Sequence, residues 1–414
     1  MSLVGLFDFN PYGDGRSIPT RRLLIAAPNM ALKIAFARMF PKAPVGDSVA
    51  QMLENAFPEY QVDTFDVTTL LKHSPGLVAA NGVAMMRAYG RDILRGYRTI
   101  GQAFWATSYL MTHVRRVLAQ KMRQQDGAYA FSFQLQSMLA LQTDLCPHFV
   151  YTDHTHLANL DYAHFDRNRL NNKAWLAEER LLYHQAKLVF TRSSNISRSL
   201  VDQYGLAAEQ AVCVYVGVNV RPQEVALPAV ARNGRYQEPH ILFVGKDWER
   251  KGGPDLVQAF MELQKSSPNA RLTIVGAAPD LNMPNCRVLG PVPVDQVSQY
   301  YQEASIFCLP TQLEPFGVAF VEAMAHRLPI VATNVGAIPD FVKTGYNGYL
   351  VSPNNVPELT AALKTLSENP ADCETFGTQG YELFAQRYNW DHVGAAVRRH
   401  VLASLAAAAH AQTN

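Results

Sequence analysis

The stretch that decides the fold is residues 305–333, SIFCLPTQLEPFGVAFVEAMAHRLPIVAT. A short apolar run, SIFCLPT, is followed by a Pro-Phe-Gly turn, a segment with helical spacing at 317–327, and a second apolar run, LPIVAT. Short apolar strands that alternate with helices are typical of a parallel sheet with crossover helices. This stretch therefore predicts one β-α-β unit of an α/β domain.

The same alternation continues on both sides of this unit. In the C-terminal half it predicts further strands and helices at 240–246, 254–266, 270–277, 286–292, 294–304 and 356–368. In the N-terminal half it predicts strands at 22–28, 60–67, 148–155, 187–192 and 211–218, and helices at 48–57, 175–186 and 195–206. The chain is therefore expected to fold as two Rossmann-like, doubly wound α/β domains.

Residues 219–240 interrupt the alternation with proline, glycine and charged residues and with little periodicity, which is typical of a linker. We therefore expect an N-terminal domain over 1–219 and a C-terminal domain over 220–389. A last helix, at about 390–414, is expected to pack back on the N-terminal domain. Two such domains face each other across a cleft, and ligands bind outside the carboxyl ends of their strands.

The composition excludes several classes of protein. Hydrophobic residues make up 48% and charged residues 17% of the 414-residue chain, and the net charge of +2 is too small to indicate nucleic-acid binding. The five cysteines are scattered without a Cys-x-x-Cys pair, which argues against a zinc site or a disulfide framework. No signal peptide and no run of about 18 apolar residues is recognised, so a cytoplasmic protein is expected.

Two glutamates in the opening stretch suggest a ligand. Glu314 follows the strand, and the turn after it leads into the helix that carries Glu322. Free backbone N–H groups near Phe316, Gly317 and Val318 favour an anion such as a phosphate. A sugar nucleotide has hydroxyls at both ends and phosphates between, which suits this order of groups. The alternative is a surface glutamate in a loop and an ordinary helical glutamate.

A second constellation lies in FVGKDWERKGGPDL, residues 243–256. The predicted strand ends at Gly245, and Lys246, Arg250 and Lys251 follow at the carboxyl edge of the same sheet. Cations at this edge are suited to neutralise the charge on a departing diphosphate. The alternative is a solvated basic loop. Neither a Walker loop nor a dinucleotide-binding Gly-x-Gly-x-x-Gly is present in the two candidate loops.

These two motifs, followed by TNVGAIPDFVKTGYNGYLV at 333–351, resemble the retaining glycosyltransferases of family 4, also called glycosyltransferase group 1. The signature of that family is Glu-x7-Glu, here Glu314 and Glu322, with a Gly-Arg/Lys…Lys-Gly loop, here 245–252. The resemblance is firm over 185–385 and weaker before it. It implies a GT-B fold, in which two Rossmann-like domains face each other across a cleft.

The resemblance also implies roles for individual residues. Lys246 and Lys251 would bind the donor diphosphate, Glu314 the donor sugar, and Glu322 the ribose hydroxyls. Many relatives have arginine where Lys246 stands, and lysine lacks the fork geometry for bidentate phosphate binding. The remaining donor contacts that it implies are backbone groups of Gly245, Val292, Phe316, Gly317 and Val318.

In the N-terminal domain, the stretch YTDHTHLANL at 151–160 follows an apolar strand. Similar proteins carry a histidine at the end of that strand, beside the donor sugar, and His154 fits better than His156. The resemblance thus makes Glu314, His154 and Lys251 the candidate catalytic residues. Asp153 and Arg192 are further candidates for the acceptor side, and the alternative for the histidines is a structural role in a polar loop.

The acceptor side departs from the family pattern. Relatives usually have a Gly-Gly pair soon after the first strand, whereas here residues 27–49 intervene with only Gly46 before the first helix. Because that loop normally helps to shape the acceptor side, Gly46 stays a candidate and the acceptor itself is not transferred from the family.

The expected reaction moves a hexosyl unit from a nucleoside-diphosphate sugar to a hydroxyl acceptor with retention of anomeric configuration. A UDP-sugar is favoured by its frequency in the family, and neither a cofactor nor a metal is expected. The alternatives are another GT-B enzyme, such as a sugar-nucleotide epimerase or a pyridoxal-phosphate phosphorylase, and a non-catalytic sugar-nucleotide-binding protein.

Residues 83–125 are unusually basic. They contain eight arginines and lysines against one acid, Asp92, with Tyr97, Phe104, Trp105 and Tyr109 interleaved. A basic helical region with aromatic residues is suited to lie on an anionic membrane, where it would serve a lipid-linked acceptor. The alternative is a solvated basic face over an aromatic stripe that faces the core. The expectation is thus a cytoplasmic enzyme, or one bound peripherally at the inner face of the membrane.

Overall fold

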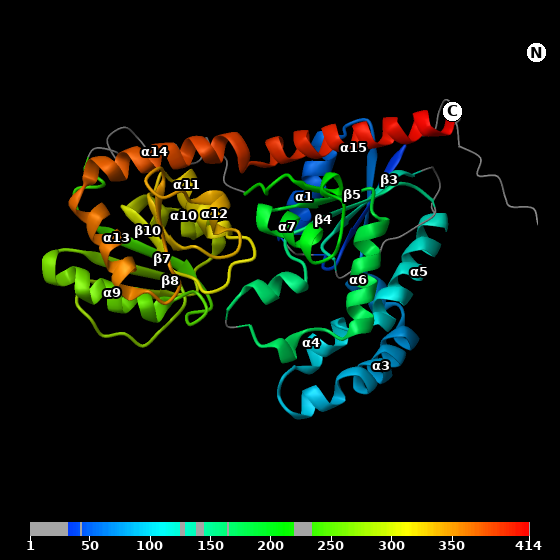
Figure 1. The fold of residues 1–414 in the computed structure, drawn as a ribbon, viewed down its shortest axis with the longest axis horizontal. Helices are drawn as coiled ribbons and strands as arrows, with labels where there is room; N and C mark the ends of the chain where they lie inside the picture. The colour runs from blue at the N-terminus through cyan, green and yellow to red at the C-terminus, as the bar shows by residue number, and fades with distance from the viewer. Residues whose placement is uncertain are drawn as a thin grey trace, which may run out of the picture.

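The computed structural model describes residues 32–41, 44–124, 129–137, 145–163, 165–218 and 234–413. They form two α/β domains, each built on a six-stranded parallel sheet with helices on its faces (Figure 1). The predicted fold class, two Rossmann-like domains, is confirmed. Inner strands of both sheets, such as β3, β4 and β10, are almost entirely buried, as expected for parallel sheets that helices cover on both faces.

The N-terminal sheet has the strand order β2-β1-β3-β4-β5-β6. Its strands are β1 (Lys33–Arg38), β2 (Gln61–Asp66), β3 (Tyr129–Leu135), β4 (His148–Thr152), β5 (Leu188–Thr191) and β6 (Ala211–Cys213). Because β1 pairs with β2 on one side and β3 on the other, the topological switch point lies between β1 and β3.

Helices surround this sheet. They are α1 (Pro44–Ala56), α2 (Val67–Lys72), α3 (Pro75–Leu94), α4 (Ile100–Trp105), α5 (Ser108–Gln124), α6 (Lys173–Gln185) and α7 (Ser194–Asp202), with short 3-10 helices at Leu157–Asp161, Arg167–Arg169 and Ala208–Gln210. Between β2 and β3 the chain makes a long excursion through α2, α3, α4 and α5. In Figure 1, α3 and α4 lie at the end of this domain remote from α15.

The C-terminal sheet has the order β12-β11-β10-β7-β8-β9. Its strands are β7 (His240–Gly245), β8 (Arg271–Gly276), β9 (Cys286–Gly290), β10 (Ile306–Leu309), β11 (Ile330–Thr333) and β12 (Gly348–Val351). The helices are α9 (Gly253–Ser266), α10 (Val294–Glu303), α11 (Val318–Ala325), α12 (Ile338–Phe341), α13 (Val356–Glu368) and α14 (Pro370–Arg387). Here the switch point lies between β7 and β10.

The last helix, α15 (Trp390–Thr413), packs on the N-terminal domain (Figure 1). Val393, Val397 and Val401 are fully buried at four-residue spacing and share a core cluster with strands of that domain. At the rim of this contact, Arg398 donates a hydrogen bond of 2.9 Å to the carbonyl of Ala56 at the end of α1.

The predicted strand at 22–28 lies outside the described residues. One interpretation of the N-terminal half is wrong, because the segment 27–49, expected as a loop before the first helix, contains strand β1. That segment also contains the start of α1, four residues before the predicted helix. Strands β3 and β12 and helix α14 were not predicted, and most of the predicted linker, 219–233, lies outside the described residues.

Candidate active site

The two sequence motifs meet at the switch point of the C-terminal sheet. Strands β7 and β10 are neighbours, so the loops at their carboxyl ends, 246–252 and 310–317, lie against each other. Gly252 has a φ of 74°, and a Cβ at this position would lie 1.9 Å from the carbonyl oxygen of Pro310. The amide of Gln312 donates a 2.9 Å hydrogen bond to the carbonyl of Arg250. A glycine is therefore required where the two loops touch.

An ion pair joins the two motifs. The ammonium of Lys251 donates a hydrogen bond to a carboxylate oxygen of Glu314, and the two side chains are only 15% and 7% exposed. A Cβ at Gly245 would lie 3.2 Å from Cγ of Lys251, so the lysine side chain lies directly over the end of β7. The pair places one positive and one negative group side by side at the carboxyl edge of the sheet.

Helix α11 begins beside this pair. Gly317 is its N-cap, with a left-handed φ of 90°, and Val318 is its first residue. The buried Phe316 ring packs edge-on against Phe341 at 5.8 Å and holds the turn in place. The first N–H groups of a helix have no partner within the helix, so the amides at this turn are available to an anion.

Glu322 lies one turn further along α11. It is partly buried and accepts a 2.9 Å hydrogen bond from the hydroxyl of Tyr301 on α10. Burial raises the pKa of the Glu322 carboxyl. The Tyr301 ring in turn stacks on His326 at 5.0 Å, so the hydroxyl that orients Glu322 is itself fixed.

The remaining candidates of the C-terminal domain differ in their exposure and in the contacts of their side chains. Lys246 is exposed at the carboxyl end of β7. Arg250 ties its own loop together, because it pairs with Asp247 at 2.9 Å and donates to the carbonyl of Leu313 at 2.8 Å. Val292 follows β9, at the far edge of the sheet, and is partly buried against the C-terminal core.

His154 faces the cleft from the N-terminal domain, just beyond β4. Both of its ring nitrogens are buried, and neither has a partner in hydrogen-bonding geometry within the described part of the chain. Burial lowers the pKa of the imidazole, so the ring is neutral at pH 7. A hydrogen bond of 2.7 Å from the Thr152 hydroxyl to the His154 carbonyl fixes this turn. A buried ring without a partner is suited to receive a ligand hydroxyl.

His156, the second candidate, is engaged within the protein. Its Nε2 accepts a 2.7 Å hydrogen bond from the amide of Asn171, and its ring meets Trp175 edge-on at 5.0 Å. Burial, together with the nearby charge of Arg98, lowers its pKa to about 4. This histidine therefore holds the 169–171 segment in place, whereas His154 is open to a ligand.

Asp153 and Arg192 form an ion pair of 3.6 Å at the same edge. The Arg192 guanidinium also lies 5.0 Å from the ring centre of Tyr151 and 5.8 Å from that of Phe316. Because Phe316 belongs to the C-terminal domain, Arg192 connects the donor turn with the N-terminal sheet.

Gly46 has a packing role in the first turn of α1. A Cβ at this position would lie 3.0 Å from Cδ of Arg38, which is itself held by Asp47 and Asp66. Gly46 does not line the cavity beside His154. The lack of a side chain at this position instead leaves room for the buried Arg38.

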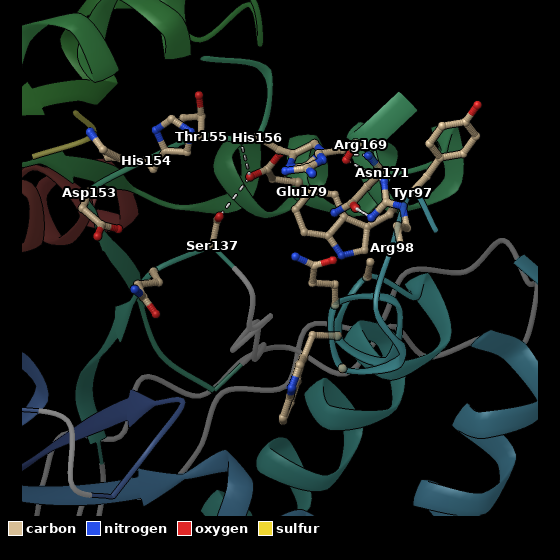
Figure 2. A pocket seen from close by; sticks show the side chains of 17 residues that line it. Tyr97, Arg98, Ser137, Asp153, His154, Thr155, His156, Arg169, Asn171 and Glu179 are labelled. Carbon is tan, nitrogen blue, oxygen red and sulfur yellow. Dashed lines mark hydrogen bonds between the residues drawn. The ribbon is translucent and has the colours of Figure 1, made fainter. Parts of the chain in front are cut away.

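A cavity of about 570 Å³ lies beyond the carboxyl end of β4 (Figure 2). It is lined by Asp153, His154 and His156 at the end of β4, by Trp105 of α4 and by Trp175 of α6. One wall is Pro315, the residue that follows the ion-paired glutamate in the other domain, so the cavity reaches the donor motif. The sequence did not single out the two tryptophans as cavity lining, because they lie 70 positions apart in the chain.

A buried carboxylate that the sequence did not reveal also lines this cavity. Glu179 of α6 accepts hydrogen bonds from the hydroxyl of Ser137 at 2.9 Å and the amide of His156 at 3.2 Å (Figure 2). It also accepts hydrogen bonds from the hydroxyls of Tyr183, at 3.3 Å, and Tyr204. Burial nevertheless raises its pKa to about 7. These bonds fix the segment that carries both histidines.

Direct contacts hold the two domains together near the site. The backbone amide and the hydroxyl of Ser194 each donate a 2.6 Å hydrogen bond to the carboxylate of Asp340. A Cβ at Gly336 would lie 2.2 Å from the carbonyl of Glu314 and 2.6 Å from the hydroxyl of Tyr162. The donor turn is thus clamped between the two domains. Within the described ranges, no group of three or more acidic, histidine or cysteine side chains is placed to hold a metal ion.

Comparison with known families gives two matches. Residues 63–221 match the family described as Glycosyltransferase Family 4, and residues 231–383 match Glycosyl transferases group 1. Among curated proteins, the chain is 28% identical to sulfoquinovosyl transferase SQD2 of Arabidopsis thaliana over 51% of this chain and 43% of that protein. It is 28% identical to D-inositol 3-phosphate glycosyltransferase of Streptomyces bingchenggensis over 53% of each. The matched part thus spans about half the length of these relatives.

Solved structures share the fold at low sequence identity. Sucrose-phosphate synthase from Thermosynechococcus elongatus superposes with a TM-score of 0.66 and 18% identity, covering 91% of this chain and all of that one. The Anabaena protein Alr3699/HepE in complex with UDP superposes with a TM-score of 0.62 and 16% identity, covering 90% of this chain and all of that one. The solved structures thus share the two-domain fold. The two family matches, over residues 63–221 and 231–383, show that this chain belongs to the group 1 glycosyltransferases of family 4.

Proposed function

We propose that this protein transfers a hexosyl unit from a UDP-sugar to a hydroxyl acceptor with retention of anomeric configuration. The observation that carries the proposal is the Lys251–Glu314 pair at the switch point, beside the amides of the α11 turn and next to the cavity under His154. A cation and backbone N–H groups suit a diphosphate, and the carboxylate suits sugar hydroxyls.

In this arrangement the donor diphosphate lies against Lys251, Lys246 and the amides of the α11 turn, and Glu322 takes the ribose hydroxyls. Glu314 and the neutral ring of His154 orient the hexosyl group from opposite domains. The acceptor hydroxyl enters from the cavity on the face that the leaving phosphate occupies. The bond from the acceptor oxygen to C1 forms as the bond from C1 to the phosphate oxygen breaks, and the leaving phosphate takes the acceptor's proton. The protein contributes positioning and charge stabilisation.

The choice of UDP draws on the structural neighbours. Alr3699/HepE, which shares the fold, is described in complexes with UDP and with UDP-glucose. The positive charge for the diphosphate comes from two lysines and backbone amides, so we propose that transfer needs no metal. Addition of EDTA is then expected to leave the rate unchanged.

The experiment is a comparison of UDP-, GDP- and ADP-sugars as donors, with release of the free nucleotide as the readout. UDP-sugar turnover is expected, with the anomeric configuration of the product read by NMR. Glu314→Gln is the matched inactive control because it keeps the shape of the side chain. Full turnover by this variant would refute the assigned role, and conversion of the donor without nucleotide release would instead indicate an epimerase.

A further inference from the structure

Helix α3 carries an exposed apolar stripe. Val83, Met86 and Leu94 are 53%, 54% and 86% exposed, and their spacing of three and eight residues places them on one side of the helix. The opposite side is used for packing, because the Asn81 side chain donates to the carbonyl of Phe104 and the Tyr89 hydroxyl donates to that of Ala106. The stripe therefore remains exposed to solvent when α3 packs on α4.

Arginines run alongside this stripe. Arg87, Arg91 and Arg95 are exposed and follow one another at four-residue spacing, one position on from the apolar residues. The single acid between residues 67 and 124, Asp92, has a side chain that is 35% exposed and lies 4.0 Å from the buried Arg98. The outer side of α3 therefore combines apolar side chains with uncompensated positive charge.

The same surface leads into the cavity. Beyond the end of α3, Tyr97 and Ile100 are 38% and 64% exposed, and Tyr97 and Gly101 also line the cavity (Figure 2). We define the α3 surface as Val83, Met86, Arg87, Arg91, Leu94, Arg95, Tyr97 and Ile100. Arg115 is not part of it, because its guanidinium is paired with Glu178 at 2.8 Å.

We propose that the α3 surface docks on an anionic lipid bilayer, so that the acceptor cavity opens at the lipid surface. Apolar side chains in a single row, flanked by arginines, match the way a helix lies in a bilayer interface with its cations at the headgroups. Among the described residues no helix is long and apolar enough to cross a membrane, so the contact would be peripheral. This inference rests on the proposed function only for its consequence, that the acceptor is an amphiphile whose hydroxyl-bearing head enters the cavity.

The test is sedimentation of the full chain, without donor, with vesicles of neutral lipid alone or with about a third anionic lipid. Binding to the anionic vesicles is expected. Replacement of Arg87, Arg91 and Arg95 by glutamine should weaken it by on the order of a hundredfold, about fivefold for each arginine. Leu94→Glu should weaken it about tenfold through lost apolar burial.

Matched controls separate this surface from general charge or hydrophobicity. Val294 on α10 is as exposed as Leu94, at 86%, so Val294→Glu should bind vesicles like the unmodified chain. Arg399→Gln on α15 removes an exposed arginine at a remote site and should also be neutral. Salt at about 1 M, where the Debye length is about 3 Å, should weaken binding of the unmodified chain.

Three results would overturn the proposal. The first is that the unmodified chain does not bind anionic vesicles, and the second is that the α3 variants bind as well as their controls. The third is that the α3 variants self-associate less than the unmodified chain in the absence of lipid, which would make this surface a protein contact. Glu314→Gln should still bind vesicles. A failure of glycosyl transfer would therefore leave the vesicle result intact, and the two proposals fail separately.

Discussion

The ion pair between Lys251 and Glu314 leads to a sharp expectation for Glu314→Gln. In the free protein the lysine is held by the carboxylate, whereas in the proposed complex it turns to the donor diphosphate. The glutamate therefore competes with the diphosphate for the lysine and also repels it. Removing its charge should make UDP bind more tightly while glycosyl transfer is lost.

The size of the effect follows from the geometry. The pair is charged on both sides and largely covered, with side chains 15% and 7% exposed, so its net stabilisation is about 1.5–3 kcal/mol. Glutamine keeps an acceptor for the lysine but loses about half of that strength. The free energy released to UDP is then about 0.8–1.5 kcal/mol, which tightens the dissociation constant roughly four- to twelvefold.

Isothermal titration of UDP into the unmodified chain, Glu314→Gln and Lys251→Met measures how each side chain of the pair affects UDP affinity. Lys251→Met should weaken UDP binding roughly ten- to a hundredfold, because a charge-assisted bond to the phosphate is lost. Transfer by Glu314→Gln should fall by about 10²–10³, the cost of removing one group that stabilises the transition state. Weaker UDP binding by Glu314→Gln would refute the competition between the two anions.

Three other perturbations test neighbouring parts of the structure. Gly252→Ala and Gly345→Ala both place alanine at a left-handed φ, 74° and 76°, but only the Cβ at position 252 would meet a neighbour. Gly252→Ala should therefore lose UDP binding and several degrees of Tm, whereas Gly345→Ala should cost about 1 kcal/mol of unfolding free energy. Equal losses in the two variants would contradict this. Glu322→Gln should weaken UDP binding about tenfold but leave pyrophosphate binding unchanged, since the carboxylate is assigned to the ribose, and a parallel loss of both would contradict that assignment. Burial lowers the pKa values of His148, His156 and His326 from 6.5 to about 3, 4 and 4, so between pH 6.5 and 4 the unfolded chain binds protons that the native chain excludes. Glu179, with a pKa raised to about 7, opposes the effect of the three histidines by binding one proton in the native chain. Because the histidines outnumber it, the Tm measured by calorimetry should fall from pH 7 to pH 5. A constant or rising Tm would contradict the predicted loss of stability.

The C-terminal domain was predictable because local signals agree there. Each of β7, β9 and β10 is a short apolar run followed by a loop and a helix, which is the local pattern that the sequence shows most clearly. The first described strand of the N-terminal domain was not, because β1 lies in a segment where the sequence indicated a loop. Its place in the sheet depends on pairing with β2 and β3, which begin at residues 61 and 129, far along the chain.

The site divides in the same way. The spacing of Glu314 and Glu322 and the glycines of the 245–252 loop are visible in the sequence. The ion pair of Lys251 with Glu314 joins residues 63 positions apart, and only the adjacency of β7 and β10 creates it. The cavity is harder still, because its walls come from α4, α6 and the end of β4. The different fates of His154 and His156, two residues apart, depend on Asn171 and Trp175 and have no local signal.

The central claim is that a donor diphosphate lies between the 246–252 loop and the start of α11, with the sugar toward His154. The most direct measurement is a crystal structure of the protein with a bound UDP-sugar. We expect the diphosphate oxygens within hydrogen-bonding distance of the Lys251 ammonium and of the amides of the α11 turn, with Glu314 released from the lysine. A diphosphate bound elsewhere, with the Lys251–Glu314 pair intact, would contradict the claim.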